Sequence, residues 1–395
     1  MVNNINIISW NARSLSCVDG QTKIAELYNF LETFENLPEI VCIQETWNHL
    51  GKKLLTLKGY KPPISFRRPK GHQGGGVAIF VKIGIDSEEI KINQSNNNIE
   101  ICMVKIYGNE NKTLDIANFY TPGGHSITAG DYAKIAAKLG KNALIVGDFN
   151  ARHTLWESGF TGRDKNALEI IDFLNNSEFL TLNTGCGTRL DPKTGKFSAL
   201  DLSLATVAVG HKCDWRVHDD ALGSDHFPTV TSINVSYKYV SQEPTPRWKL
   251  SKADWGLFKQ ITDKMNLCFD NQTINESNEH FILELMGACN ASIPKTKTNK
   301  KNKKVLPWWD ETCTLAVKKK RIAYKKYKKH QTAEFLEQFR TARNESKHTL
   351  KTVRQEKWRT FISTLNYKTD SKKIWDTIKK FNGKPFHPIE VLKVN

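Results

Sequence analysis

The chain has 395 residues, of which 39% are hydrophobic and 25% charged, and its formal net charge is +17. Single hydrophobic cores stop growing near about 250 to 300 residues, so we expect one large domain and a smaller part. No apolar run reaches the roughly 18 residues of a membrane span, and the start MVNNINIISWN lacks the pattern of a signal or transit peptide. We therefore expect no membrane partner and a location in the cytoplasm and nucleus.

Charge is distributed unevenly along the chain. Residues 1–290 carry 30 Lys and Arg against 32 Asp and Glu, whereas residues 291–395 carry 28 against 9. A basic tail of this density favours a polyanionic partner, with nucleic acid ahead of an anionic membrane. A solvated, lysine-rich helical face with no such partner is the alternative.

The cysteines give no sign of a metal site. No two of them form a CxxC or CxxxC pair, so we expect reduced thiols, several of them in the core. The eight are Cys17, Cys42, Cys102, Cys186, Cys213, Cys268, Cys289 and Cys313.

Extended apolar runs alternate with segments of helical periodicity up to about residue 235. Apolar residues at three-and-four spacing predict helices at 23–35, 129–140 and 165–176. The pattern predicts an α/β fold in which two large sheets pack together with helices outside. Predicted strands span residues 5–10, 39–44, 76–81, 99–107, 113–120, 143–149, 199–205 and 228–235.

The strand pattern stops after residue 236, where the stretch SQEPTPRWKLS is typical of a linker. Residues 295–310 (KTKTNKKNKKVLPWWD) are polar and basic, which predicts a flexible arm without a core. Long basic helices are expected between about residues 311 and 381. The predicted organisation is a domain at 1–235, a linker and basic arm at 236–310, and a basic helical region at 311–395.

Polar side chains recur at the ends of the predicted strands, where open sheets usually place their active sites. Each alone is more often a turn-former or a helix cap than a catalyst, so the recurrence is the signal. The candidates are Asn11, Glu45, Tyr120, Asp148, Asn150, Asp201, Asp225 and His226.

These residue types suit the hydrolysis of a phosphate ester. A hard cation such as Mg²⁺ prefers carboxylate oxygens, which Glu45 supplies with the help of Asn11. His226 suits proton transfer or phosphate binding, and a carboxylate such as Asp201 would fix its tautomer. We expect two further strand-end residues, Asp148 and Asn150, to orient the attacking water. Tyr120 would donate a hydrogen bond to a phosphate oxygen. It fits equally well as a packed, half-exposed aromatic ring.

Two basic segments suggest contacts with nucleic acid. Arg67, Arg68 and Lys70 stand just before the glycines at 74–76, so this loop would contact the phosphate backbone without reading sequence. A tight glycine turn with incidental charges explains the loop equally well. In the tail, aromatics alternate with lysines in AYKKYKKH and EKWRTF, which suits stacking on single strands. The same aromatics also fit the apolar stripe of a helix.

The ordered motifs ISWNARSL, IQETW, NFYTPGG, GDFNARHTLW, TGKFSALDLSLA and LGSDHFP resemble the endonuclease domain of non-LTR retrotransposons. That domain belongs to the superfamily of DNase I and the abasic-site endonucleases. The resemblance covers nearly all of residues 1–235 and implies a four-layer sandwich of two mixed sheets flanked by helices. It also implies the site roles: Glu45 and Asn11 at the metal with Asp225 beside it, Asp148 and Asn150 at water and phosphate, Asp201 with His226 as a pair, and Tyr120 and Ser198 at the phosphate.

Two positions depart from the abasic-site enzymes. Arg13 stands where those enzymes tend to carry an acidic residue, which argues against a repair function. Gly123 follows Pro122 where an Asn is usual, so one polar phosphate contact would be missing. We expect the second departure to affect rate and not reaction type.

The resemblance implies a Mg²⁺-dependent endonuclease, with Mn²⁺ as a substitute, that nicks double-stranded target DNA and leaves a 3′-hydroxyl to prime reverse transcription. The basic tail would contact element RNA, and a reverse transcriptase would follow in the same polyprotein. The polymerase motif itself, an aromatic residue before two aspartates, is not found in this sequence. The alternatives are a host phosphodiesterase of the same fold, such as an abasic-site nuclease or an inositol or lipid phosphatase, and a catalytically dead relic that binds nucleic acid.

Overall fold

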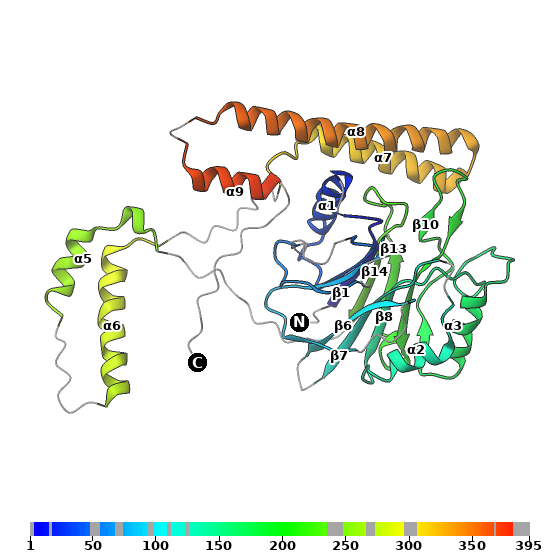
Figure 1. The fold of residues 1–395 in the computed structure, drawn as a ribbon, viewed down its shortest axis with the longest axis horizontal. Helices are drawn as coiled ribbons and strands as arrows, with labels where there is room; N and C mark the ends of the chain where they lie inside the picture. The colour runs from blue at the N-terminus through cyan, green and yellow to red at the C-terminus, as the bar shows by residue number, and fades with distance from the viewer. Residues whose placement is uncertain are drawn as a thin grey trace. The chain divides into compact units, whose positions relative to one another are not determined.

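The structure is a computed structural model, drawn in Figure 1, and it divides the chain into two compact units. The first unit comprises residues 1–240 and 304–395, and the second comprises residues 241–303. The basic helical region therefore belongs to the same unit as the predicted 1–235 domain. The residues described are 4–15, 18–47, 56–67, 74–92, 98–108, 112–123, 126–234, 248–265, 273–295, 306–366 and 369–381.

One six-stranded mixed sheet contains the first strands of the chain. β1 pairs with β2 in parallel and with β14 antiparallel, so the carboxyl ends of β1 and β2 meet at one edge. Two short strands, β13 and β3, form the borders and were not predicted, because neither carries a long apolar run. The order is β13 (Cys213–Val217), β14 (Thr229–Asn234), β1 (Asn4–Asn11), β2 (Ile40–Gln44), β4 (Val77–Val81), β3 (Ile64–Phe66).

The second six-stranded sheet is also mixed. β7 and β8 run parallel, and β12 runs antiparallel to β8, so that β12 begins at the edge where β7 and β8 end. A separate two-stranded ribbon pairs β10 (Arg189–Leu190) with β11 (Phe197–Ser198). The order in the sheet is β5 (Ser87–Glu89), β6 (Glu100–Tyr107), β7 (Thr113–Tyr120), β8 (Ala143–Asp148), β12 (Asp201–Thr206), β9 (Phe179–Thr181).

The two sheets pack face to face around a buried core that includes Ile7, Cys42 and Val146. A polar link crosses this core near the carboxyl end of β2. Gln44 donates to Asn118 at 2.7 Å, and Asn118 donates to the backbone carbonyls of Ile43 and Ala78. Buried amides of this kind fix one alignment of the sheets, because any slip would leave polar groups unpaired.

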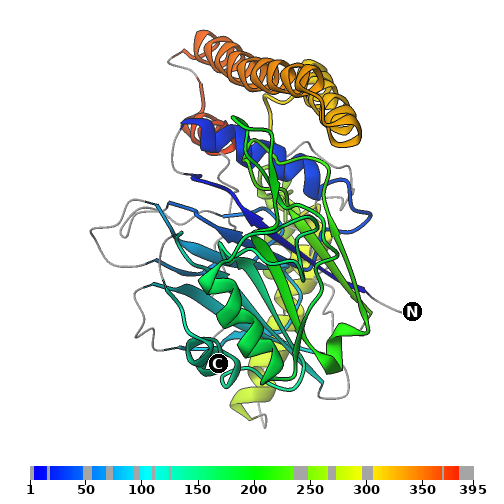
Figure 2. The same cartoon turned by 90° about the vertical axis from the view of Figure 1, so that its right-hand side faces the viewer.

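Helices cover the outer faces of both sheets. α1 (Val18–Leu31) covers the first sheet, and α2 (Ala129–Ala136) with α3 (Lys165–Asn175) covers the second (Figures 1 and 2). The short α4 (Val207–Gly210) follows β12. These helices complete the four predicted layers, so the predicted fold class is confirmed.

A helical hairpin of α7 (Glu311–His330) and α8 (Ala333–Ser363) packs against the sheet domain next to α1 (Figure 1). The turn between them is short because Gln331 adopts a left-handed backbone and Thr332 caps α8. The two Trp residues just before α7, Trp308 and Trp309, are buried with α1 and α8 in one core. The prediction that residues up to 310 form a flexible arm is therefore wrong for 306–310, where apolar burial outweighs the basic composition.

The aromatic residues of α7 are also buried. Tyr324 stacks on Phe227 with ring centroids 4.6 Å apart, and Tyr327 stacks on Phe197 at 6.0 Å. They form a core cluster with Leu336 and others, so the helical-stripe interpretation of AYKKYKKH is correct and the single-strand stacking interpretation is wrong for these two rings. Trp358 of α8 packs against Phe361 and Phe381, the last residue of α9 (Ser371–Phe381).

The second unit is a small helical hairpin. It contains the 3-10 turn η2 (Leu250–Lys252), α5 (Trp255–Thr262) and α6 (Ile274–Ser292), and Lys295 lies over the ring of Trp248. A capping box between Thr273 and Glu276 starts α6. Throughout the described parts of both units, every helix is too short or too polar to span a bilayer.

Candidate active site

The predicted site residues come together at one edge of the two sheets. Asn11 is the last residue of β1, Glu45 directly follows β2, and Asp148 is the last residue of β8. Tyr120 and Asp201 are the register partners of Asp148 on its two neighbouring strands. The strand directions thus explain why residues distant in the sequence share one edge.

Asn11 links the two sheets at the centre of the site. Its Nδ2 donates to Glu45 Oε1 at 3.0 Å and to Asp148 Oδ2 at 2.8 Å. Its Oδ1 accepts from the backbone N–H of Arg13 at 2.9 Å. Because the amide N–H groups are shared between two carboxylates, Asn11 holds the acidic side chains near one another despite their mutual repulsion.

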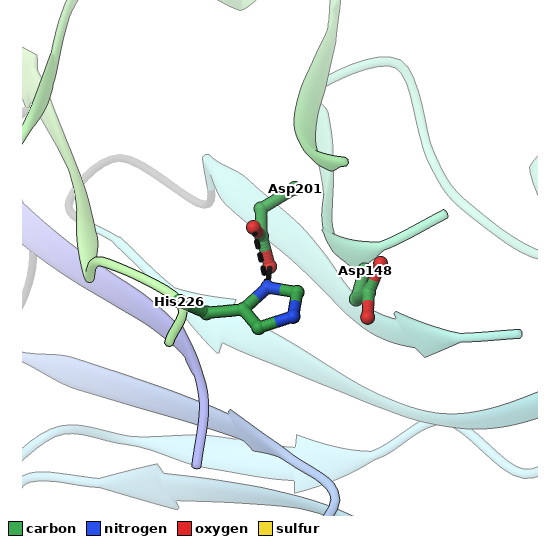
Figure 3. A group of neighbouring side chains, drawn as sticks. All are labelled: Asp148, Asp201 and His226. Atoms are coloured by element: carbon green, nitrogen blue, oxygen red, sulfur yellow. Dashed lines mark hydrogen bonds and ion pairs between the residues drawn. The ribbon is translucent and has the colours of Figure 1, made fainter. Parts of the chain in front are cut away.

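His226 forms a buried pair with Asp201, as the sequence predicted (Figure 3). His226 Nδ1 lies 2.8 Å from Asp201 Oδ2, and Thr188 donates its hydroxyl to the same oxygen at 2.6 Å. Burial alone would lower the pKa of His226, but Asp201 and, more weakly, Asp148 and Asp225 raise this pKa to about 9. The imidazole is thus held in one orientation and favours its protonated form.

Asp148 lies beside this pair and has its own support. Its Oδ1 accepts the backbone N–H of Asn150 at 3.0 Å, and the Asn150 side chain donates to the Thr121 carbonyl at 2.8 Å. Burial raises the pKa of Asp148 to about 7, the attraction of His226 opposes this, and the charge of Asp201 adds to it. The preceding Gly147 is required because a Cβ there would lie 1.8 Å from the carbonyl oxygen of Phe119.

The backbone is strained at this edge. Arg13, Ser14, Glu45, Trp47 and Asn150 all adopt a left-handed backbone, with φ between 45° and 78°. Non-glycine residues in this region typically cost on the order of 1 to 3 kcal/mol each and cluster at functional sites. The surrounding fold thus holds these residues in an unfavourable backbone conformation, which sets the direction of their side chains.

The glycines at 74–76 support the loop that carries Glu45. The N–H groups of Thr46 and Trp47 donate to the carbonyls of Gly76 and Gly75 at 3.1 and 2.9 Å. All three glycines have positive φ, and a Cβ at Gly76 would lie 2.4 Å from the Thr46 hydroxyl. The tight-turn interpretation of this loop therefore applies to the glycines themselves.

The same loop carries the three residues predicted to contact DNA, Arg67, Arg68 and Lys70. Arg67 donates to the Gly74 carbonyl at 3.1 Å, which ties its side chain to the turn. Arg68 and Lys70 lie outside the described residues. The role of this loop in DNA binding therefore stays a prediction.

Three further predicted residues, Tyr120, Ser198 and Asp225, are buried. Tyr120 belongs to the core between the sheets. Ser198 pairs with Arg189 in the β10–β11 ribbon. Asp225 accepts from two guanidiniums, Arg13 at 2.8 Å and Arg189 at 3.0 Å, and its other oxygen has no hydrogen-bond partner among the described residues.

Two groups of side chains could hold a cation. Asp148, Asp201 and His226 have ligand atoms within 4.8 Å of one another. However, His226 Nδ1 and Asp201 are already committed to each other, which leaves this group fewer free donors. Glu45 is the half-exposed carboxylate of the site, so we favour the Glu45 and Asn11 side as the cation position.

Several supporting residues were not predicted from the sequence. Lys23 donates from α1 to the carbonyls of Ala12, Arg13 and Ser14 at 2.8, 2.7 and 3.3 Å. Thr188 also accepts the backbone N–H groups of Leu200 and Asp201. Neither residue stands in a strand-end motif, so no local pattern marks it. Gln44 stands inside the IQETW motif, and its position there is a signal that could have found it.

Comparison with known proteins identifies the sequence relatives. The chain is 25% identical over 281 residues to the probable RNA-directed DNA polymerase from transposon BS of Drosophila melanogaster, covering 70% of this chain and 29% of that protein. It is 23% identical over 295 residues to the RNA-directed DNA polymerase from mobile element jockey of the same species, covering 73% and 30%. The chain thus spans less than a third of the length of these relatives, and the predicted resemblance is confirmed.

Two solved structures have a chain path similar to part of this one. The endonuclease domain of TRAS1, a telomere-specific non-LTR retrotransposon, is 20% identical with a TM-score of 0.46, covering 59% of this chain and 99% of that one. The catalytic domain of Xenopus laevis APE2 is 15% identical with a TM-score of 0.47, covering 60% and 94%. The profile of the Endonuclease/Exonuclease/phosphatase family matches residues 8–226, which include all the strand-end residues described above. The chain belongs to this family.

Proposed function

We propose that this chain is a metal-dependent endonuclease that hydrolyses one phosphodiester in a strand of duplex DNA. The observation that carries the proposal is the hydrogen-bonded convergence at the sheet edge: Glu45, Asn11 and Asp148 in one chain of contacts, with the Asp201–His226 pair beside it. Carboxylates at a cation position next to a buried acid and a protonated imidazole are what hydrolysis of a charged phosphate requires.

The residues present fit a hard divalent cation. Glu45 is half-exposed, and its two oxygens each accept one donor, from Asn11 and from the indole of Trp47. Asp225 adds a buried carboxylate oxygen without a partner among the described residues. All these donors are oxygens, which Mg²⁺ prefers and Mn²⁺ accepts. When bound, the ion would polarise the phosphate and offset charge on the leaving oxygen.

The residues of the chain would divide the remaining work. Asp148, with its pKa near neutrality because of burial, would take a proton from the attacking water. Asp201 orients His226 so that the second ring nitrogen faces the side of Asp148 (Figure 3). That nitrogen would donate to a non-bridging phosphate oxygen, where the protonated imidazole offsets the charge that develops. Asn150 would steady Asp148 through the backbone N–H that it donates.

The relatives favour DNA as the substrate. They are named as polymerases of mobile elements, and an endonuclease in such a protein would cut the target before synthesis begins. We infer that attack on phosphorus breaks the bond to O3′, which leaves a 3′-hydroxyl to prime reverse transcription. A reverse transcriptase would follow in the same polypeptide, the basic C-terminal region would contact element RNA, and the protein would act in the nucleus.

The proposal is tested by incubating the purified chain with supercoiled plasmid and Mg²⁺. We expect relaxation to open circles that needs metal, is stopped by EDTA, and falls by about a thousandfold or more in Glu45→Gln. A DNA polymerase should then extend the nicks directly if they carry 3′-hydroxyls. Nicking that persists in Glu45→Gln would contradict the site assignment.

Two other outcomes would overturn the proposal. Hydrolysis of small phosphate monoesters without plasmid nicking would point to a phosphatase of the same family. Salt-sensitive DNA binding with no hydrolysis under any metal would point to a catalytically dead binding protein.

A further inference from the structure

Several arginine side chains lie around Asp225, beside the proposed hydrolytic site, and the proposed mechanism gives them no role. The Asp225 carboxylate receives two guanidiniums on one oxygen, from Arg13 at 2.8 Å and from Arg189 at 3.0 Å. The Arg13 side chain is 57% exposed, so most of its remaining N–H groups face solvent. One carboxylate cannot satisfy two guanidinium forks, because each fork offers five donors.

The docked hairpin brings a third guanidinium to this place. Arg343 of α8 is half-buried, and no hydrogen bond or ion pair is found for it among the described residues. Burial lowers the pKa of Arg343, Asp225 and, more weakly, Glu26 raise it, and Arg13 lowers it, so these charges act on one another. A residue about 330 positions along the chain from Arg13 thus acts electrostatically on the same carboxylate, Asp225.

Nearby acidic residues do not balance this cluster. Glu26 and Asp220 are the buried acids between α1 and α7, and both are paired with Lys320. Asp220 also pairs with Arg321 at 2.7 Å. Two acids thus meet two bases there, whereas Arg13, Arg189 and Arg343 share the charge of Asp225, to which Glu26 adds only a weaker attraction for Arg343. Half-buried positive charge of this kind is costly unless an anion joins it.

The cluster is also held in place before any anion arrives. Lys23 bonds the carbonyls of residues 12–14, and Arg13 is fixed in a left-handed backbone conformation. Arg189 is anchored because β10 lies against the segment that carries Asp225, with Leu190 N–H donating to the Asp225 carbonyl at 2.9 Å. Donors that need no rearrangement bind an anion more strongly, because less conformational freedom is lost on binding.

We propose that Arg13, Arg189 and Arg343 form a subsite for a backbone phosphate that neighbours the scissile phosphodiester. This inference rests on the proposed function, since it assumes a polynucleotide in the site. Guanidinium forks match phosphate oxygens and set the register of the strand without reading bases. The hairpin of α7 and α8 would then be part of the substrate site through Arg343.

The first test measures binding without hydrolysis. Wild type, Arg343→Ala, Arg343→Lys and Arg13→Gln are titrated against a labelled DNA duplex in EDTA at several salt concentrations. We expect Arg343→Ala to bind about tenfold more weakly, with a salt slope smaller by about one, and Arg343→Lys to recover part of the loss. The matched control is Arg359→Ala, an exposed arginine on the same helix, which should bind like wild type.

A thermal melt of each variant separates binding from folding. Removing an unpaired half-buried cation should leave the melting temperature of Arg343→Ala unchanged or raised. A lowered melting temperature together with wild-type binding would mean that Arg343 is structural, and this would overturn the subsite.

The second test locates the phosphate. Duplexes carry one neutral methylphosphonate linkage at each position in turn, and binding is measured for wild type and Arg343→Ala. We expect one position at which the neutral linkage weakens wild type but causes no further loss in Arg343→Ala. Additive losses at every position would overturn the subsite. Arginine-dependent binding without nicking would refute the proposed function alone, whereas nicking by wild type with binding indifferent to Arg13 and Arg343 would refute the subsite alone.

Discussion

Two buried ion pairs in this protein have similar geometry but different charge balance. In the site, His226 lies 2.8 Å from Asp201, with Asp148 as a second acid close by. Between α1 and α7, Lys320 lies 2.9 Å from Asp220 and also pairs with Glu26, while Arg321 supplies a second base. Acid exceeds base in the first group, and the two are equal in the second.

This difference in charge balance separates a group suited to proton transfer from a group that stabilises the fold. The unbalanced group leaves Asp148 with a pKa raised by burial to about 7, where a proton can be gained or lost near neutral pH. In the balanced group, burial opposes the charge of Lys320, but Asp220 and Glu26 hold the pKa of its amine above the usual value. The ion pairs of Lys320 with Asp220 and Glu26 join α7 to the sheet domain and to α1, so this group fixes the helical hairpin on the domain.

The largest effect should come from the unbalanced group. His226→Gln removes the imidazolium that pairs with Asp201 and the proposed phosphate donor, so we expect plasmid nicking to fall by about a thousandfold or more. The control is His211→Gln, an exposed histidine outside the site, which should nick at the wild-type rate. Nicking by His226→Gln within tenfold of wild type would show that the His226–Asp201 pair is structural, like the ion pairs of Lys320.

Substitution in the balanced group should lower the stability of the fold. The Lys320 side chain is 6% exposed, so Lys320→Met removes the cation that pairs with buried Glu26 and leaves Asp220 with Arg321 alone. This should cost about 3 to 5 kcal/mol in the free energy of unfolding. Its neighbour Lys319 is 67% exposed and pairs with Glu345 on the surface, so Lys319→Met should cost less than about 1 kcal/mol. Urea denaturation followed by circular dichroism measures both. Equal losses would mean that burial of the pair contributes nothing.

A smaller effect should appear at His218, which stands two residues before Asp220 and packs against Phe30 with ring centroids 4.2 Å apart. Burial lowers the pKa of His218 to about 4, opposed by Asp220 and aided by Arg321. Because the folded pKa is below the unfolded value, its contribution to stability is present above about pH 6.5 and lost as pH falls toward 4.

The measurement compares wild type with His218→Phe, which keeps an aromatic ring and does not titrate. Between pH 7 and 4.5, wild type should lose about 2 to 3 kcal/mol more unfolding free energy than the variant. Parallel losses in the two proteins would contradict the buried neutral state of His218.

Much of the sheet domain could be predicted from the sequence. The predicted strands 99–107 and 143–149 correspond to β6 and β8. Each contains an apolar run, which can be recognised in the sequence without knowing which strands pair with it. The helix predicted at 165–176 is α3, because its apolar spacing is local. Short strands such as β10 and β11 were missed, since two residues of pairing leave no periodic pattern. The polar residues at the strand ends were identified from their residue types and motif order, and their roles remain proposals.

The sequence by itself determined the layers, the family resemblance and which polar residues end the strands, because these depend on patterns within a few residues. Only the tertiary structure decided that the basic tail docks on the domain, since Lys320 and Glu26 pair across 294 positions of sequence. The same holds for the electrostatic influence of Arg13 and Asp225 on Arg343. Composition predicted a solvated or nucleic-acid-binding tail, but the burial of Trp308, Tyr324 and Lys320 depends on where a distant helix and loop present apolar surface and opposite charge.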